Sequence, residues 1–294
     1  MTARRLRAVG TVFRREVTTV VRTPGYWLLS IGLLAVLSGV LVIGGGGRTG
    51  FIPAIVDLLV PTEVLVPLLA VVLGYRALLA DAERGELAVI RTYPVSVPAY
   101  VCGVLLGRIL ALLAVIGPFA LLGGYIWLTA SPETGIYATH AGVDSPIVYV
   151  RFLAFVWLLG VTYLAAAMAA GTLVRSRRGA IAIATLVLVG GVLGGDLVVM
   201  DVLRDSSDAG ALPDLLAMTP NGAFRGLVLE YVIGVAFAPE SGFISPGRAI
   251  AGLVGWTVAG IATSIAVVAY GSRVGDAIER LRRRVHEREN ADGE

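Results

Sequence analysis

The chain has 294 residues, of which 56% are hydrophobic and only 15% are charged. Soluble domains carry about 25% charged residues, so this composition argues against a water-soluble globular protein. All 24 residues counted as Lys or Arg are arginine, and without lysine the chain forms neither a P-loop for ATP nor a Schiff base with a cofactor. Cys102 is the single cysteine in the sequence, which excludes an internal disulfide and a cysteine-based zinc site.

Residues 1–25 predict an amphipathic helix. An apolar residue recurs every three or four positions, at Leu6, Val9, Phe13, Val17 and Val20. Arginines occupy the other faces of this helix. We expect the helix to lie in the cytoplasmic membrane interface, where anionic lipid attracts it. A surface for a cytoplasmic partner protein is the alternative.

Six later stretches predict membrane-spanning helices, each of which needs about 20 mainly apolar residues. They cover residues 26–43, 55–79, 109–129, 152–174, 179–203 and 249–272. The sequence therefore predicts an all-α, polytopic membrane protein with six transmembrane helices. The membrane domain is expected to extend over residues 26–273 and to be followed by a basic cytoplasmic tail, residues 274–294.

The positions of the arginines predict the orientation of the chain in the membrane. Of the 24 arginines, 19 lie in the N-terminal segment, in or beside the connections that follow the second and fourth spans, and in the C-terminal segment after the sixth span. By the positive-inside rule these segments, and therefore both termini, are cytoplasmic. Because the basic charge is divided among segments that flank the membrane, nucleic acid is not expected as a partner. The exclusive use of arginine suggests a GC-rich prokaryote, and hence its cell membrane as the location.

Two connections between spans are long. The cytoplasmic one, residues 80–98, contains a charged run that predicts a short helix ending before Pro94. The outer one, residues 204–248, begins polar and becomes apolar, with a turn signal at Asn221-Gly222. We expect the outer connection to form two short re-entrant helices that dip into the outer leaflet and are covered by protein.

Four acidic residues fall within the predicted spans, two in the second span and two in the fifth. Glu63 lies 16 residues before the end of the second span, which is about 24 Å along a helix and within a hydrocarbon core of about 30 Å. Carboxylates inside a membrane are usually functional, so Glu63 and Asp196 are candidate functional residues. The alternative is that Pro61 and Pro67 distort this end of the span and let Glu63 reach interfacial water. For Asp196 and Asp201, the alternative is that the span ends before them.

Three stretches of the chain carry distinctive motifs. The first comprises Gly74-Tyr75, Glu83-Arg84-Gly85-Glu86-Leu87 and Tyr93-Pro94-Val95-Ser96. The others are Leu173-Val174-Arg175-Ser176-Arg177-Arg178 and Thr219-Pro220-Asn221-Gly222-Ala223-Phe224-Arg225. With these motifs the chain resembles the ABC-2 type permeases, the membrane subunits of ABC exporters that have a separate ATPase chain. It is similar in particular to the permease of the nitrous oxide reductase maturation system, which is linked to copper processing. It departs from that pattern at Glu86, Ala88 and Val97.

The resemblance implies an ABC-2 type permease fold and a homodimer, with each subunit docked on an ABC ATPase subunit. That partner would bind ATP and Mg and hydrolyse the ATP, so this chain would be no enzyme and would hold no cofactor and no metal. The N-terminal helix and residues 80–98 would dock the ATPase, the latter with Glu83, Arg84, Gly85, Glu86, Arg91 and Pro94. In the outer connection, the resemblance implies that Pro220, Asn221, Phe224 and Arg225 belong to a motif of the family.

Physical reasoning also favours a docking role for residues 80–98. A short charged helix fits the groove of a partner, and ion pairs there set register and partner choice. The alternative is a loop helix that is only solvated.

Copper(I) prefers Cys and Met ligands, and the chain offers Cys102, Met168, Met200 and Met218 without a paired spacing. Direct conduction of copper is therefore not expected. A permease that moves another species, or that transmits force to an extracytoplasmic partner through residues 204–248, fits better. Three alternatives stay open: an ABC-2 exporter of an unrelated substrate, a non-catalytic scaffold, and an intramembrane enzyme that uses Glu63, Asp196 and Asp201. Co-purification of an ATPase would separate a transporter from the last two.

Overall fold

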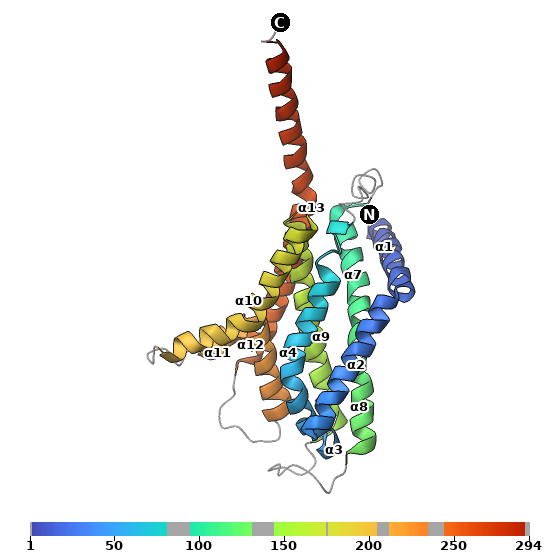
Figure 1. Ribbon diagram of the computed structural model, residues 1–294, viewed down its shortest axis with the longest axis vertical. Coiled ribbons are helices and arrows are strands. Elements are labelled where there is room, and N and C mark those ends of the chain that lie inside the picture. Colours follow the sequence, from blue (N-terminus) through green and yellow to red (C-terminus); the bar gives the residue numbers. More distant parts are fainter. Residues whose placement is uncertain are drawn as a thin grey trace.

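The computed structural model is a bundle of long helices (Figure 1). It describes residues 2–80, 95–130, 144–174, 176–204, 212–234 and 244–291. Within these ranges all regular secondary structure is helical, and six helices are long and apolar enough to cross a membrane. The prediction of an all-α chain with six membrane-spanning helices is therefore confirmed. The predicted coupling residues lie outside the described ranges; they are Glu83, Arg84, Gly85, Glu86, Arg91 and Pro94.

The chain begins with α1 (Thr2–Arg22), which packs against α7 (Val97–Ile116) at one end of the bundle, here called the α1 end. At Thr23 the backbone is extended, and Pro24 opens α2 (Pro24–Gly44). Proline suits a first turn because the N–H that it lacks would have no partner there. The α2 helix buries one stripe, formed by Leu33, Leu37 and Leu41. Its other faces expose apolar residues, as suits a span that faces lipid.

A tight turn joins α2 to α4 (Phe51–Gly74) at the opposite end of the bundle, here called the α3 end. Gly45 has a φ of 81°, which glycine adopts without strain, and α3 (Gly46–Thr49) is a single turn. The two carboxylate oxygens of Asp144 accept the backbone N–H groups of Phe51 and Ile52, at 3.0 and 2.9 Å. Asp144 thus caps the start of α4, where a carboxylate satisfies free N–H groups and complements the helix dipole.

The third span is made of two consecutive helices, α7 and α8 (Pro118–Thr129), which meet at Gly117. The α7 helix begins at Val97, earlier in the sequence than the predicted start of this span at residue 109. The next helix, α9 (Pro146–Thr172), packs against α4 and α7. The aromatic ring of Phe152 on α9 is fully buried, so α9 lies in the interior of the bundle.

The α10 helix (Arg177–Arg204) leads away from the bundle toward α11 (Leu212–Met218) (Figure 1). The chain returns through α12 (Pro220–Val228), which continues into one π-helical turn, η3 (Leu229–Ile233), against α9. The sequence predicted two short helices in the 204–248 connection, and α11 and α12 are two such helices. Their depth in the membrane stays a prediction.

The last helix, α13 (Pro246–Ala291), carries the sixth span and continues past the other helices at the α1 end (Figure 1). It packs along α9, where the hydroxyl groups of Thr162 and Thr257 are hydrogen bonded at 3.1 Å. The indole N–H of Trp256 donates to the carbonyl of Met218 at 2.9 Å. These contacts join α13 to α9 and to the end of α11.

Burial divides the six spans into two groups. Half or more of the span residues of α4, α7–α8 and α9 are buried, against about one in six in α2, α10 and α13. The first group therefore forms the core of the bundle. The second group forms its periphery, and the exposed apolar side chains of these helices are available to lipid or to another protein.

Candidate functional site

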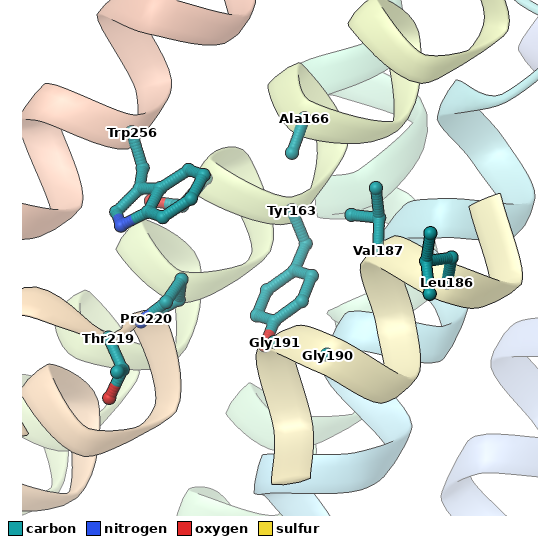
Figure 2. Close-up of a pocket in the computed structure, with 10 residues that line it drawn as sticks. Tyr163, Ala166, Leu186, Val187, Gly190, Gly191, Thr219, Pro220 and Trp256 are labelled. Atoms are coloured by element: carbon teal, nitrogen blue, oxygen red, sulfur yellow. The ribbon is translucent and has the colours of Figure 1, made fainter. Parts of the chain in front are cut away.

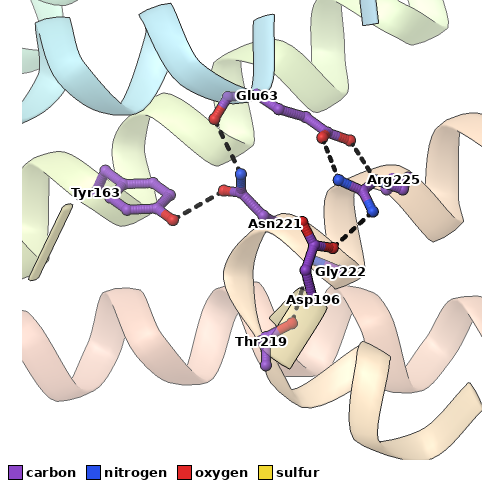
Figure 3. Close-up of polar contacts among 7 residues, drawn as sticks. All are labelled: Glu63, Tyr163, Asp196, Thr219, Asn221, Gly222 and Arg225. Atoms are coloured by element: carbon purple, nitrogen blue, oxygen red, sulfur yellow. Dashed lines mark hydrogen bonds and ion pairs between the residues drawn. The ribbon is translucent and has the colours of Figure 1, made fainter. Parts of the chain in front are cut away.

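Arg225 on α12 brings together the two acidic residues that the sequence singled out in the spans (Figure 3). Its Nε and Nη2 donate to the two carboxylate oxygens of Glu63 on α4, at 2.8 and 2.5 Å. Its Nη1 donates to Oδ1 of Asp196 on α10, at 2.8 Å. The guanidinium group therefore ties α12 to both α4 and α10. We call Glu63, Asp196 and Arg225 the ion-pair cluster.

Asn221 extends this cluster to α9 (Figure 3). Its Nδ2 donates to the backbone carbonyl of Glu63 at 2.9 Å, and its Oδ1 accepts the hydroxyl group of Tyr163 at 2.8 Å. Asn221 is buried, and a buried amide is tolerated only when its hydrogen bonds are made. Asn221 and Arg225 are four residues apart, so they share one side of the helix. That side contacts both the backbone and the side chain of Glu63.

The first turn of α12 explains how the helix is positioned. Thr219 is the N-cap, and its hydroxyl oxygen accepts the backbone N–H of Gly222 at 3.2 Å. Pro220 follows in the first turn, where it costs no hydrogen bond. Phe224 is fully buried, with its ring 6.3 Å from that of Phe152 on α9. The outer-connection motif therefore caps, starts and packs this helix.

The three charges of the cluster differ in exposure. The side chain of Glu63 is 4% exposed, whereas those of Arg225 and Asp196 are 36% and 48% exposed. Hydrogen bonding to Glu63 raises the pKa of the Arg225 guanidinium above its usual range, so this group stays charged. The buried carboxylate of Glu63 is not hydrated, and the two hydrogen bonds from Arg225 compensate for the lost hydration energy. Asp196 is half exposed and depends on Arg225 less.

The hypothesis of an intramembrane enzyme used three acidic residues together, and the structure brings two of them into one cluster. Glu63 and Asp196 are both ion-paired with the guanidinium group of Arg225. Asp201, the third residue of that hypothesis, is exposed on α10. The cluster is arranged to fix α12 in place.

A second polar cluster joins α1, α2 and α7 at the α1 end. The Glu16 carboxylate is 3.3 Å from Nη2 of Arg108 and 3.0 Å from Nη2 of Arg15. Nη1 of Arg108 also donates to the hydroxyl group of Tyr26 at 2.8 Å. Gly107 permits this close approach of α1 to α7, because a Cβ at that position would overlap the Glu16 side chain. The N-terminal helix is therefore fixed to the start of the third span.

Sequence reasoning missed three of these residues: Glu16, Arg108 and Tyr163. For Glu16 a signal was available, because it falls on the apolar stripe of the N-terminal helix, between Phe13 and Val20. A carboxylate on an apolar stripe indicates a buried partner. No pattern in the sequence marks the role of Tyr163.

An apolar cavity of about 320 Å³ lies between α9, α10 and α13, beside Tyr163 (Figure 2). Trp256, Leu186 and Pro220 contribute to its lining. Gly191 lets α10 approach this tyrosine, because a Cβ at that position would lie 2.7 Å from a ring carbon. The lining offers few polar groups, so an apolar molecule is the class of ligand that fits.

Among the described residues, no group of three or more His, Cys, Asp or Glu side chains is placed to hold a metal ion. Cys102 lies on α7 and is partly buried. The candidate site is therefore the ion-pair cluster with Asn221 and Tyr163, which joins α4, α9, α10 and α12 (Figure 3).

Comparisons with known proteins agree with this architecture and confirm the resemblance seen in the motifs. Residues 11–273, which include all six spans, match the family described as ABC-2 family transporter protein. Over 229 residues, 74% of this chain, the sequence is 31% identical to the "Probable ABC transporter permease protein NosY" of Pseudomonas aeruginosa, and it covers 80% of that protein. It is 32% identical over 229 residues to the protein of the same name from Stutzerimonas stutzeri, of which it covers 79%. The chain therefore belongs to the ABC-2 family of transporter proteins and is a membrane permease subunit of an ABC transporter.

Proposed function

We propose that this permease works with a separate ATPase subunit, which binds ATP and Mg and hydrolyses the ATP. The observation that carries the proposal is the fixed position of α1 on α7, through the Glu16–Arg108 pair at 3.3 Å. Residues 80–98 connect α4 to α7 at the same end of the bundle. A partner that bound α1 and residues 80–98 would therefore contact elements that are joined to one another. The absence of lysine supports a separate ATPase, because a P-loop needs one.

In the proposed arrangement the α1 end is cytoplasmic, and the membrane is the cell membrane of a prokaryote. The positive-inside rule supports this orientation, since 19 of the 24 arginines lie in the segments assigned to that side. We expect α1 to lie at the interface with anionic lipid. Two copies of the chain are proposed to form the transporter, and the exposed apolar faces of α2, α10 and α13 are the surfaces on which a second copy would pack.

We further propose that the transporter takes part in the maturation of nitrous oxide reductase, a process linked to copper. Support comes from the motif resemblance and from the two relatives named NosY permease. The proposed mechanism transmits the ATPase cycle to an extracytoplasmic partner through residues 204–248. The ion-pair cluster supports this route, because it holds α12 of that connection on α4 and α10. Export of an unrelated substrate is the alternative.

The test is co-expression of the full chain with an ATPase subunit encoded in the same genome. In one variant, Glu83→Arg and Glu86→Arg reverse two charges of the proposed docking segment. The matched control reverses two charges in the connections assigned to the other side, Glu133→Arg and Glu240→Arg. We expect the first variant to lose ATPase co-purification and permease-dependent ATP hydrolysis, while its unfolding transition stays unchanged. We expect the control to retain both activities.

Unchanged co-purification and hydrolysis in the Glu83→Arg/Glu86→Arg variant would contradict the docking role of this segment. Loss of ATPase binding in the Glu133→Arg/Glu240→Arg control, with docking intact in the first variant, would reverse the proposed orientation.

A further inference from the structure

A second cavity, of about 570 Å³, lies between the first turns of α2 and the last turns of α4, at the α1 end. We call it the α2–α4 cavity. One part of its lining is polar and comes from two arginines and two tyrosines, Arg76, Arg108, Tyr26 and Tyr75. The rest is apolar and includes Leu29 and Val72. The cavity is therefore amphipathic.

Among the described residues that line the cavity, the charged ones are the two arginines, Arg76 and Arg108. The side chain of Arg108 is 17% exposed, and the carboxylate that pairs with it, Glu16, is shared with Arg15. Nε of Arg108 is buried and has no hydrogen-bond acceptor among the described atoms. A buried donor in that state is destabilising, so this part of the cavity favours an anion that accepts hydrogen bonds.

The apolar part of the lining indicates that this anion carries a hydrocarbon chain. The cavity lies where two spans end, since α2 begins at Pro24 and α4 ends at Gly74. Val72 is 45% exposed, so the apolar part opens to the outer surface of the bundle. A free phosphate ion would leave this part empty, whereas an acyl chain would fill it. Arginine and tyrosine side chains are also typical of the headgroup level of a membrane.

We infer that the α2–α4 cavity binds one anionic phospholipid, with its phosphate group between Arg76 and Arg108 and an acyl chain along Leu29 and Val72. Guanidinium groups suit this ligand because they donate two parallel hydrogen bonds to a phosphate. Basic pockets between membrane spans bind anionic headgroups in the same way. The inference rests on the permease alone and does not require the ATPase.

The position of the cavity gives the lipid a second effect. Arg76 lies four residues before residue 80, and Arg108 lies on α7, the helix that begins at the other end of residues 80–98. A phosphate group bound to both arginines would therefore link the helices on either side of residues 80–98, the segment proposed to dock the ATPase.

The test uses the full chain, purified in detergent and freed of lipid. Dioleoyl phosphatidylglycerol, dioleoyl phosphatidylcholine or inorganic phosphate is added, and native mass spectrometry counts the bound molecules. We expect one phosphatidylglycerol to bind about tenfold more tightly than phosphatidylcholine. Both lipids carry the phosphate group, but the choline cation of phosphatidylcholine would be repelled by the two arginines. Inorganic phosphate should not compete. Equal affinity for the two lipids, or full competition by inorganic phosphate at the lipid's concentration, would overturn the inference.

Variants place the lipid in this cavity. Val72→Trp fills the apolar part and keeps every charge, and Val64→Trp is its matched control, because both valines are on α4 and 45% exposed but only Val72 lines the cavity. Arg76→Gln removes one cation, with Arg151→Gln on α9 as control. We expect Val72→Trp and Arg76→Gln each to weaken phosphatidylglycerol binding about tenfold and the controls to retain it. Wild-type affinity in Val72→Trp refutes the inference even if Arg76→Gln does not fold.

Discussion

Replacing Arg225 with leucine should destabilise the permease, because it removes the partner of a buried carboxylate. The Glu63 side chain is 4% exposed, and both of its oxygens accept hydrogen bonds from Arg225, at 2.8 and 2.5 Å. Leucine donates no hydrogen bond, so Arg225→Leu leaves Glu63 buried and unpaired. Breaking a buried ion pair in this way costs about 3–5 kcal/mol. We expect the free energy of unfolding to fall by that amount.

Two further variants separate this effect from a general loss of packing. Adding Glu63→Leu to Arg225→Leu should restore most of the stability, since replacing a whole buried ion pair with apolar residues is often neutral. Asp196→Asn is the matched control, because Asp196 contacts the same guanidinium group but is 48% exposed and lies at the end of its span. Its loss should cost about 1 kcal/mol or less.

Unfolding by SDS in mixed micelles, followed by tryptophan fluorescence, measures these differences as a double-mutant cycle. We expect the wild type and Asp196→Asn to have similar free energies of unfolding, and the double variant to be nearly as stable. Arg225→Leu should be much less stable than all three. The reasoning is refuted if Arg225→Leu costs no more than Asp196→Asn. It is also refuted if the double variant loses as much as the sum of its two single changes.

Three further predictions concern other contacts. Gly107→Leu should push α1 away from α7, because the new side chain would occupy the place of Glu16. ATPase co-purification should then fall, while size-exclusion chromatography still shows a folded permease. Full ATPase binding by this variant would contradict the prediction. Asp144→Ala should lower the free energy of unfolding by about 1 kcal/mol, because it removes the cap of α4. An unchanged midpoint of the SDS unfolding transition would show that the cap does not stabilise the protein. Tyr163→Phe leaves Oδ1 of the buried Asn221 without its hydrogen-bond donor. It should lower the free energy of unfolding by about 1 kcal/mol in the same assay. Equal stability of the variant and the wild type would contradict this prediction.

The six spans could be predicted because hydropathy is a local property, but the start of the third span could not. Arg108 interrupts the apolar run, so the prediction began after it, whereas α7 begins at Val97. The structure shows why a charge is tolerated inside this helix: Glu16 of α1 pairs with it at 3.3 Å. Hydropathy along the chain contains no information about a partner supplied by another helix.

Every member of the candidate site except Tyr163 was identified from the sequence, but for separate reasons. Glu63 and Asp196 were noted as acids within spans, and Asn221 and Arg225 as parts of a motif in the 204–248 connection. Glu63 and Arg225 are 162 positions apart, and no periodicity relates residues on different helices. The sequence predicted a turn at Asn221-Gly222, and this was wrong, since both residues lie inside α12. The N-cap at Thr219 and the proline in the first turn start a helix there instead.

The α4 helix is the element that links the candidate site to the proposed docking region. Its middle holds α12 through Glu63, and its C-terminal end leads through Arg76 into residues 80–98. Half of its span is buried, and it packs along α9, so it is supported over its length. A displacement at its C-terminal end would therefore move Glu63 with it.

The contacts of α12 decide which helix it would follow. Its side chains bond both the backbone and the carboxylate of Glu63 on α4, whereas α10 holds it through the half-exposed Asp196. The bidentate contact with Glu63 is the stronger of the two ion pairs. Because α12 also packs on α9 and α13, the ion pair with Asp196 is the contact that should change first. The Gly107→Leu and Arg225→Leu variants therefore test opposite ends of one path. The first should weaken ATPase binding, and the second should leave that binding intact while removing the contact of α12 with the Glu63 carboxylate.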